Sequence, residues 1–425
     1  MDGSTESINP DDALLLSADA ARIVLESGGE TYRAEDAAVN FATALGGAEA
    51  ECFATPTGVT FSFAAADGRI HSIVRRIKRR SMHLERIALV DELARDLAAG
   101  RADYRSASDR LESIERRPES PVALSVGAAA AGAGFFTLLF GGAWNDALVA
   151  AAAGALVTRL PPAMARRKLP DFFSNIVAGA AATLLSLFAG SLGLAADADA
   201  TAIGVLMLLV PGVAVTNAIR DTIAGDLVAG VARGADALMS AAAISVGAGA
   251  AYWAWRLAEG AAGAPSAAAA AVAAAAPWPA ALWAGLATAG FALLFSARRR
   301  DLPLAALGGA LGWAVAAPLR PLCGSEALAC LAASAAIGVY AELVAALRRR
   351  PASIYIACGI IPLVPGGGMY YTMLDYVRGE NWRSLSTAFA TLLTAGAIAV
   401  GLAVSSAASR ILSLRRLGAR LGPGP

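Results

Sequence analysis

Leu209-Val210-Pro211-Gly212 recurs 154 residues later as Leu363-Val364-Pro365-Gly366, and each copy ends a hydrophobic run. At this constant shift, residues 209–247 match residues 363–401 without a gap, with 12 identities in 39 positions. The matched polar and glycine pairs, which alanine abundance does not explain, are Asp221 with Asp375, Gly225 with Gly379, and the acids Asp226 with Glu380. The chain therefore contains a duplication.

The composition indicates a protein that lies mostly in a membrane. Hydrophobic residues make up 57% of the chain and charged residues 16%, with a mean hydropathy of +0.56. Soluble proteins average about 25% charged residues. Both signs of charge are dense in residues 1–118 and sparse beyond Pro118 and Pro121, so we expect a soluble domain over 1–118 followed by membrane repeats.

Ten apolar segments follow, and several reach the roughly 20 residues that a bilayer span needs. The fourth and the ninth are short, and both end at Val-Pro-Gly. The segments are 119–142, 147–163, 172–194, 200–213, 234–258, 279–297, 302–318, 326–347, 352–366 and 384–408.

The shift of 154 places the first five segments over the last five. Because each repeat has an odd number of spans, the two copies would have opposite orientations. The predicted fold is thus an α-helical polytopic membrane protein with ten transmembrane segments as a 5+5 inverted repeat, in residues 119–278 and 279–425. In transporters this arrangement lets one half rock against the other around a central site. The alternative is a duplication kept only for packing.

The N-terminal region has the patterns of a small α+β domain. Apolar stripes at helical spacing alternate with short β-branched and aromatic runs that are separated by turn residues. The predicted helices are 11–28, 31–45, 82–99 and 106–115, and the predicted strands are 49–55, 59–65 and 69–74.

The charges predict the topology. The first residues are polar and acidic, without the basic and then apolar start of a signal peptide, so we expect the N-terminal domain to stay in the cytoplasm. Basic clusters at 166–168 (Arg-Arg-Lys), 298–300 and 348–350 and in the C-terminal tail then fall on the same side as this domain. By the positive-inside rule, both termini are cytoplasmic.

The two Pro-Gly sites predict breaks in membrane helices. A proline lacks a backbone N–H, so Pro211 would free the carbonyl of Met207, and Pro365 would free that of Ile361. An unsatisfied carbonyl in lipid costs several kcal/mol, so such breaks persist only beside protein or a water-filled cavity. Free carbonyls suit an ammonium or ion, and a helix N-terminus suits a carboxylate. The predicted substrate-binding residues are Pro211, Gly212, Thr216, Asn217, Arg220, Pro365, Gly366, Gly367, Gly368, Tyr370 and Tyr371.

Acidic residues near the breaks are candidates for proton coupling, because desolvation favours protonation of a carboxylate. The candidates are Asp221, Asp226 and Asp375. The alternative is that these carboxylates only solvate loops.

Other classes of site have little support. A net charge of +1 argues against a nucleic-acid partner. The four cysteines have neither metal-ligand nor disulfide spacing, and the sequence has no His-Glu metal spacing, nucleophile elbow or phosphate loop. We therefore expect no catalytic residue, no metal and no cofactor.

The motifs resemble those of a known family. Four stretches resemble the first half of the threonine/serine exporter family. They are residues 25–36 (Leu-Glu-Ser-Gly-Gly-Glu-Thr-Tyr-Arg-Ala-Glu-Asp), residues 55–58 (Thr-Pro-Thr-Gly), Pro211-Gly212 with residues 216–221 (Thr-Asn-Ala-Ile-Arg-Asp), and residues 225–227. Residues 359–368, Tyr370 and Gly379-Glu380 resemble its second half. The chain has Ser81-Met82-His83-Leu84 where the family tends to read Ser-Ile-Asp-Leu.

The resemblance covers nearly the whole chain and implies a bacterial inner-membrane secondary exporter driven by the proton gradient. Its partners would be a small-molecule substrate, protons and the lipid bilayer, with homo-oligomerisation left open. Related two-subunit systems are linked to export of dicarboxylates such as succinate, which is the alternative substrate class. Two further alternatives are a membrane-tethered hydrolase and a scaffold that transports nothing.

Overall fold

The computed structural model describes residues 9–65, 68–259 and 277–420, without the side chains of 259, 277, 278, 410 and 412–420. These residues form two compact units. The first unit contains the chain up to residue 119, together with residues 221–233 and 295–298. The second contains the remaining described residues. The alanine-rich stretch around the expected boundary at 278 lies mostly outside the described residues.

The first unit is a three-stranded antiparallel sheet in the order β1-β2-β3 with four helices. Its register pairs Phe61 of β2 with Cys52 of β1 and Ile73 of β3. The elements are α1 (Pro10–Glu26), α2 (Thr31–Ala44), β1 (Ala48–Thr55), β2 (Gly58–Ala64), β3 (Ile70–Arg76), α3 (Leu84–Ala98) and α4 (Tyr104–Glu115). The predicted helices and strands of this region are confirmed, with ends that shift by only a few residues.

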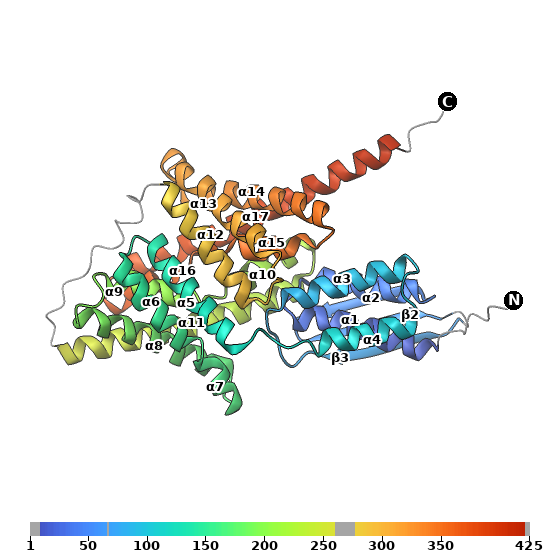
Figure 1. Ribbon diagram of the computed structural model, residues 1–425, viewed down its shortest axis with the longest axis horizontal. Helices are drawn as coiled ribbons and strands as arrows, with labels where there is room; N and C mark the ends of the chain where they lie inside the picture. Colours follow the sequence, from blue (N-terminus) through green and yellow to red (C-terminus); the bar gives the residue numbers. More distant parts are fainter. Residues whose placement is uncertain (1–8, 66–67, 260–276, 421–425) are drawn as a thin grey trace. The chain divides into compact units, whose positions relative to one another are not determined.

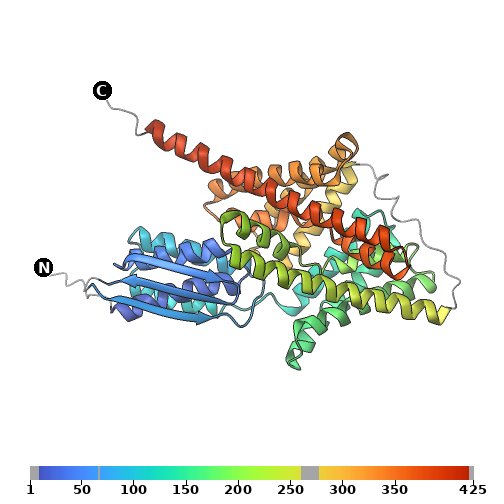
Figure 2. The same cartoon turned by 180° about the vertical axis from the view of Figure 1, so that it is seen from behind.

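All four helices lie on one side of this sheet (Figure 2). Alternation along β2 points Val59, Phe61 and Phe63 toward the helices, where they are buried. Helices α1 and α2 pack directly on the strands, and α3 and α4 pack on those helices. The other sheet face leaves Phe53 and Val74 exposed.

The second unit is helical (Figure 1). Its elements, some of which share residues with the first unit, are α5 (Val122–Leu139), α6 (Trp144–Val157), α7 (Leu160–Arg166), α8 (Asp171–Ser191), α9 (Ala198–Leu206), α10 (Gly212–Ala224), α11 (Leu227–Glu259), α12 (Pro277–Leu294), α13 (Leu302–Cys323), α14 (Glu326–Arg348), α15 (Ala352–Gly359), the short 3-10 helix η2 (Ile361–Leu363), α16 (Gly366–Val377) and α17 (Asn381–Arg420).

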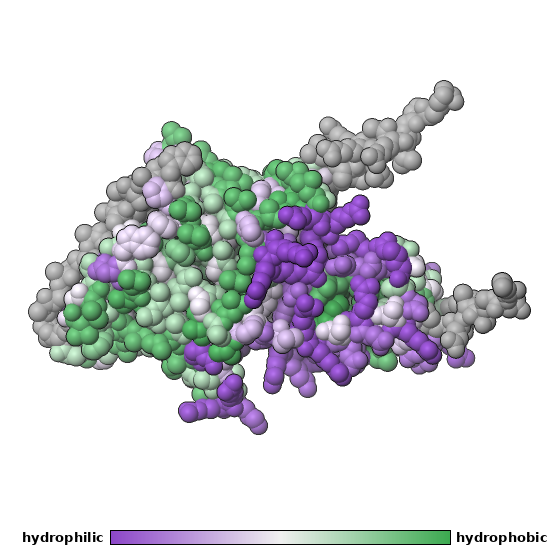
Figure 3. Space-filling model, in the orientation of Figure 1, coloured by the Kyte–Doolittle hydropathy of each residue, from purple (hydrophilic) through white to green (hydrophobic). Residues whose placement is uncertain are grey.

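Eight helices or helix pairs in the described residues are long and apolar enough to cross a membrane. Apolar residues cover much of the surface of the helical unit, as Figure 3 shows. Two of the ten predicted segments fall outside the eight. Segment 279–297 contains a shorter apolar helix, Pro279–Leu294, and segment 200–213 contains the nine-residue α9, which ends before its break.

The duplication seen in the sequence recurs in the helix boundaries. Shifting α9 and α10 by 154 residues places them over α15 and α16, and both α10 and α16 begin at the glycine of a Pro-Gly pair. Packing repeats as well, because α6 and α8 both pack on α9, while their counterparts α13 and α14 both pack on α15.

Small residues permit close helix crossings in both copies. Gly247 of α11 lies against the backbone of α8 at Ile176, and its counterpart Gly401 of α17 lies against the backbone of α14 at Leu331. A side chain at either glycine would collide with that backbone. Close approach through small residues is a common way for helices to pack within a membrane.

Two expectations about the breaks need correction. The carbonyl of Ile361 does not lose its partner, because the chain tightens into η2 and the amide of Val364 donates to it at 3.2 Å. Asp199 lies just before the predicted start of the fourth segment at residue 200, yet it stands in the first turn of α9 and is only 6% exposed. The apolar segment therefore begins earlier in the structure than hydropathy predicted.

Candidate functional site

The two Pro-Gly breaks meet each other in the second unit. A Cβ atom on Gly212 would lie 2.5 Å from a Cγ atom of Val364, and one on Gly366 would lie 3.0 Å from a Cγ atom of Val210. The two contacts are equivalent, because at the shift of 154 Gly212 corresponds to Gly366 and Val210 corresponds to Val364. Each break thus packs against the valine of the other. A Cβ atom at Gly212 would collide with Val364, and one at Gly366 would collide with Met207 Sδ as well as press on Val210.

The backbone turns in the same way at both breaks. The amide of Gly212 donates to the carbonyl of Val210 at 2.8 Å, and the amide of Gly366 donates to that of Val364 at 2.8 Å. A new helix starts at each glycine, so the first amides of α10 and α16 have no partner one turn earlier in the helix. Such helix starts attract anionic groups.

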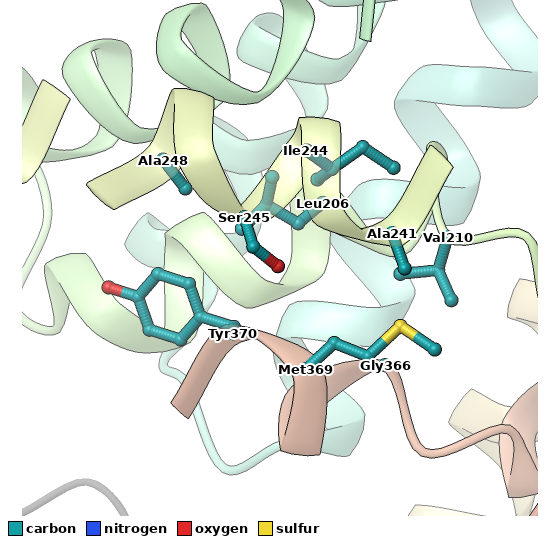
Figure 4. A pocket seen from close by; sticks show the side chains of 9 residues that line it. All are labelled: Leu206, Val210, Ala241, Ile244, Ser245, Ala248, Gly366, Met369 and Tyr370. Atoms are coloured by element: carbon teal, nitrogen blue, oxygen red, sulfur yellow. The ribbon is translucent and has the colours of Figure 1, made fainter. Parts of the chain in front are cut away.

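A small cavity lies beside the second break, between α11 and α16. In Figure 4, Ser245 on α11 faces Met369 and Tyr370 on α16 across this space. In this conformation the cavity has room for about one water molecule. It is lined by Leu206, Val210, Ala241, Ile244, Ser245, Ala248, Gly366, Met369 and Tyr370.

Two of the predicted substrate residues, Gly366 and Tyr370, line the cavity. Thr216 and Asn217 are buried on α10, where the Thr216 hydroxyl donates to the carbonyl of Gly212 at 3.0 Å. The predicted residues that are half-buried are Pro211, Arg220, Pro365, Gly367, Gly368 and Tyr371. Most of the cavity-lining residues that were not predicted from the sequence belong to α9 and α11. They are apolar or small, and no nearby proline or charge pointed to them.

A polar cluster behind Tyr370, formed with Asp199, Arg378 and Tyr252, was also not predicted from the sequence. The Tyr370 hydroxyl donates to Asp199 Oδ1 at 3.0 Å, and Arg378 Nη2 lies 4.0 Å from Asp199 Oδ2. Arg378 also donates to the Tyr252 hydroxyl at 3.3 Å, and its guanidinium lies 5.6 Å from the centre of the Tyr252 ring. Helices α9, α11 and α16 therefore meet through one carboxylate, one guanidinium and two phenols.

Asp221 belongs to a different cluster, within the first unit. Its Oδ2 lies 2.8 Å from Arg233 Nε and accepts a hydrogen bond from the Thr31 hydroxyl at 3.1 Å. Arg233 also donates to the carbonyl of Gly29 at 2.8 Å. Residues of the 25–36 motif thus contact both members of the buried Asp221–Arg233 ion pair. Burial raises the pKa of the Asp221 carboxyl, while the charge of Arg233 opposes that rise.

Asp375, the counterpart of Asp221, is 3% exposed in the second unit. The Thr387 hydroxyl lies 3.4 Å from Asp375 Oδ2, and Arg383 Nε lies 3.7 Å from the same oxygen. Thr387 stands at the repeat position of Arg233, so both buried acids have a partner twelve residues later. At this position the first copy has a charged partner and the second copy a neutral one, while Arg383 supplies a more distant charge beside Asp375.

The turns after these acids also repeat. The amide of Asp226 donates to the carbonyl of Asp221 at 2.9 Å, and that of Glu380 donates to the carbonyl of Asp375 at 2.9 Å. Gly225 and Gly379 have φ values of 100° and 81°, a region that favours glycine. Asp226 is half-buried and Glu380 is exposed.

Comparison with known proteins identifies relatives along most of the chain. The family model described as "Putative threonine/serine exporter" matches residues 16–254, and the family model described as "Threonine/Serine exporter, ThrE" matches residues 280–408. The chain is 25% identical over 394 residues to a "Probable threonine/serine exporter" of Mycobacterium tuberculosis, covering 89% of this chain and 73% of the relative. It is 27% identical over 344 residues to a "Threonine/serine exporter" of Corynebacterium glutamicum, covering 78% and 68%.

No solved structure matches the chain. The family models together cover both the α+β unit and the duplicated helices, and the helices include eight candidate spans among the described residues. The chain is therefore a multi-pass membrane protein that belongs to the threonine/serine exporter family.

Proposed function

We propose that this protein is a secondary exporter that moves threonine, serine and similar small amino acids out of the bacterial cytoplasm, driven by the proton gradient. The reciprocal contact of the two breaks, Gly212 with Val364 and Gly366 with Val210, carries the proposal. Helix breaks at matching points of a duplicated membrane unit are typical of transporter substrate sites. Packing alone does not require broken helices, since continuous helices satisfy their backbone groups better in lipid.

The proposed transport cycle uses the duplication. Residues 119–278 and 279–425 act as two five-span repeats of opposite orientation, and one repeat rocks against the other across the crossed breaks. Both termini and the α+β domain over 1–118 lie in the cytoplasm, on the side of the basic clusters. The small cavity then represents a closed conformation, which opens as the breaks separate.

The substrate would lie against the two new helix starts. We assign its binding to the main chain at Pro211-Gly212 and Pro365 to Gly368, with side chains from Thr216, Asn217, Arg220, Tyr370 and Tyr371. The amides at the start of α10 and α16 suit the substrate carboxylate. Hydroxyl groups such as that of Tyr370 suit the ammonium or the substrate hydroxyl.

Proton coupling would involve the acids that follow the breaks, Asp221, Asp226 and Asp375. Two observations support a role for Asp221. Among the described residues its Oδ1 has no hydrogen-bond partner, and burial raises the pKa of this carboxyl. Both features favour proton uptake on a buried carboxylate.

The test is efflux of labelled threonine, serine and succinate from proteoliposomes that contain the purified full chain, with and without an imposed proton gradient. Gradient-stimulated efflux of the two amino acids alone would support the proposal. Efflux of succinate instead would assign the chain to dicarboxylate export. No efflux of any of the three would favour the enzyme or scaffold alternatives, and an unchanged rate under the gradient would reject proton coupling.

A further inference from the structure

We propose that Asp199 and Arg378 are the charged pair that recognises a zwitterion, with Asp199 binding the substrate ammonium and Arg378 binding the substrate carboxylate. This inference rests on the proposed export function and names the substrate class of the site. Neither residue stood out in the sequence, because Asp199 comes just before an apolar segment and Arg378 follows one.

The cavity beside the breaks has no charge of its own. Its polar side chains are the hydroxyls of Ser245 and Tyr370, and its other lining residues are apolar or glycine. Moving a charged ammonium or carboxylate into such surroundings is costly unless each charge finds a partner. A zwitterionic substrate therefore needs one anion and one cation close to this space.

Asp199 and Arg378 supply these charges directly behind Tyr370. The Tyr370 ring lines the cavity while its hydroxyl donates to Asp199 at 3.0 Å, so this one side chain separates the cavity from the charged pair. Rotation of the Tyr370 side chain would connect the two. Tyr371 lies next to this side chain, with its ring centre 5.5 Å from that of Tyr370.

The pair itself is loose. Its closest atoms are 4.0 Å apart, at the limit of an ion pair, although the Asp199 side chain is 8% exposed and that of Arg378 18% exposed. Each member is instead held by a tyrosine hydroxyl, Tyr370 for Asp199 and Tyr252 for Arg378. Because the two charges are oriented by phenols and do not form a short ion pair, each remains able to pair with the complementary charge of a zwitterionic ligand.

The duplication shows that these groups are not a by-product of the repeat. At the shift of 154, Asp199 corresponds to Ser353, Tyr370 to Thr216, Arg378 to Ala224 and Tyr252 to Ser406. The backbone of the breaks is the same in both copies, yet only one combination of positions carries the charges and the phenols. Because the charged and phenolic residues occur at only one of the two matched combinations, they can form one substrate site rather than two equivalent sites.

The charge balance distinguishes two substrate classes. One carboxylate beside one guanidinium matches a ligand with no net charge, such as threonine or serine. A dicarboxylate would place one of its anionic groups against Asp199, and like charges at that distance repel. The geometry therefore favours an amino acid over a dianion.

The experiment compares threonine with two analogues that each lack one charge. 3-Hydroxybutyrate lacks the amino group of threonine, and threoninol has an alcohol in place of its carboxylate. Inhibition of labelled threonine efflux is measured in proteoliposomes for the wild-type chain, Asp199→Asn and Arg378→Gln. The matched controls are Asp197→Asn, at the same end of α9, and Arg383→Gln, a more exposed arginine close in sequence to Arg378.

We expect wild-type efflux to be inhibited by unlabelled threonine at least about tenfold more strongly than by either analogue, the loss typical of one charge-assisted contact. Asp199→Asn should raise the KM for threonine and abolish the preference over 3-hydroxybutyrate alone. Arg378→Gln should abolish the preference over threoninol alone, and Arg378→Lys should restore it in part. Both controls should keep both preferences.

The ratio of inhibition by threonine to inhibition by an analogue does not depend on how much of a variant folds. If Arg378→Gln does not fold at all, Arg378→Lys provides a second variant at the same position. Variants that transport more slowly but keep the wild-type KM and both preferences would overturn the inference and leave the pair a structural one. If the wild-type chain exports neither threonine nor serine, the proposed function itself fails.

Discussion

Gly212 lies against Val364 so closely that the glycine has no room for a side chain, and Gly366 lies against Val210 and Met207, which together leave no room there either. Two helix breaks 154 residues apart in the sequence therefore share one contact. In the proposed cycle, movement of one repeat against the other would have to separate these residues.

Adding a methyl group at this contact should impair transport. We expect Gly212→Ala to destabilise the closed arrangement by about 1–3 kcal/mol, the usual cost of overpacking. Shortening the opposing side chain in Gly212→Ala/Val364→Ala should recover much of the loss, which a double-mutant cycle of efflux rates would measure. Gly396→Ala is the control, because a Cβ there meets nothing within 4 Å. A strictly additive double mutant would contradict the direct contact.

Asp221→Asn should destabilise the first unit. The change leaves Arg233, which is largely buried, without its charge partner, a situation that typically costs about 3–5 kcal/mol. Hydrogen–deuterium exchange of the full chain should show faster exchange in α2, which carries Thr31. Asp226→Asn, at a half-buried position, should leave that exchange near the wild-type rate. Equal protection in Asp221→Asn and wild type would show that the ion pair contributes little.

Asp375→Asn removes an ionisable group but keeps nearly the same shape. If Asp375 takes up the coupling proton, efflux of threonine should lose most of its stimulation by an imposed proton gradient while efflux without a gradient persists. The comparison variant is Glu380→Gln, because Glu380 is an exposed acid five residues away. Full stimulation in Asp375→Asn would remove this residue from the coupling role.

His83 should make the start of α3 sensitive to pH. Its Nδ1 accepts a hydrogen bond from the amide of Arg86 at 3.3 Å, which caps the helix only while this nitrogen is unprotonated. Burial and then the nearby charge of Arg86 lower the pKa of His83. The folded state thus binds fewer protons than the unfolded state, so the cap's contribution is complete above the ordinary pKa of about 6.5 and is lost as the pH falls through the lower folded value.

Hydrogen exchange in residues 84–90, corrected for intrinsic rates, measures this effect in the full chain between pH 7.5 and pH 5. We expect protection to fall at the acidic end in the wild type. His83→Asn keeps a side-chain acceptor at the cap but does not titrate, so it should abolish the change. A pH dependence that persists in His83→Asn would point to another group.

Labelling of single cysteines should decide the topology. In a background without Cys52, Cys323, Cys330 and Cys358, Arg166→Cys should react with an impermeant reagent only from the cytoplasmic side, and Ala196→Cys only from outside. Both positions are exposed. The reverse pattern would move the α+β domain to the outside and overturn the proposed direction of transport.

Several features of this protein follow from local sequence alone. Alternation of apolar residues was enough to predict β2, because its period of two residues is set by the strand geometry itself. The start of α10 at Gly212 and of α16 at Gly366 was predictable, since a proline removes a helical hydrogen bond and the glycine after it gives the backbone freedom to turn. The duplication was visible because a shift of 154 preserves the Pro-Gly pairs and the acids after them.

Only the tertiary structure decided what these elements contact. No local signal states that Val364 fills the space above Gly212, because that contact arises from packing between segments far apart in the chain. Asp199 and Arg378, 179 positions apart, approach each other to 4.0 Å for the same reason, and Asp221 contacts Thr31 rather than the cavity. Periodicity and backbone chemistry act within a few residues and fix the elements, whereas the partner of a buried charge depends on which helices pack together.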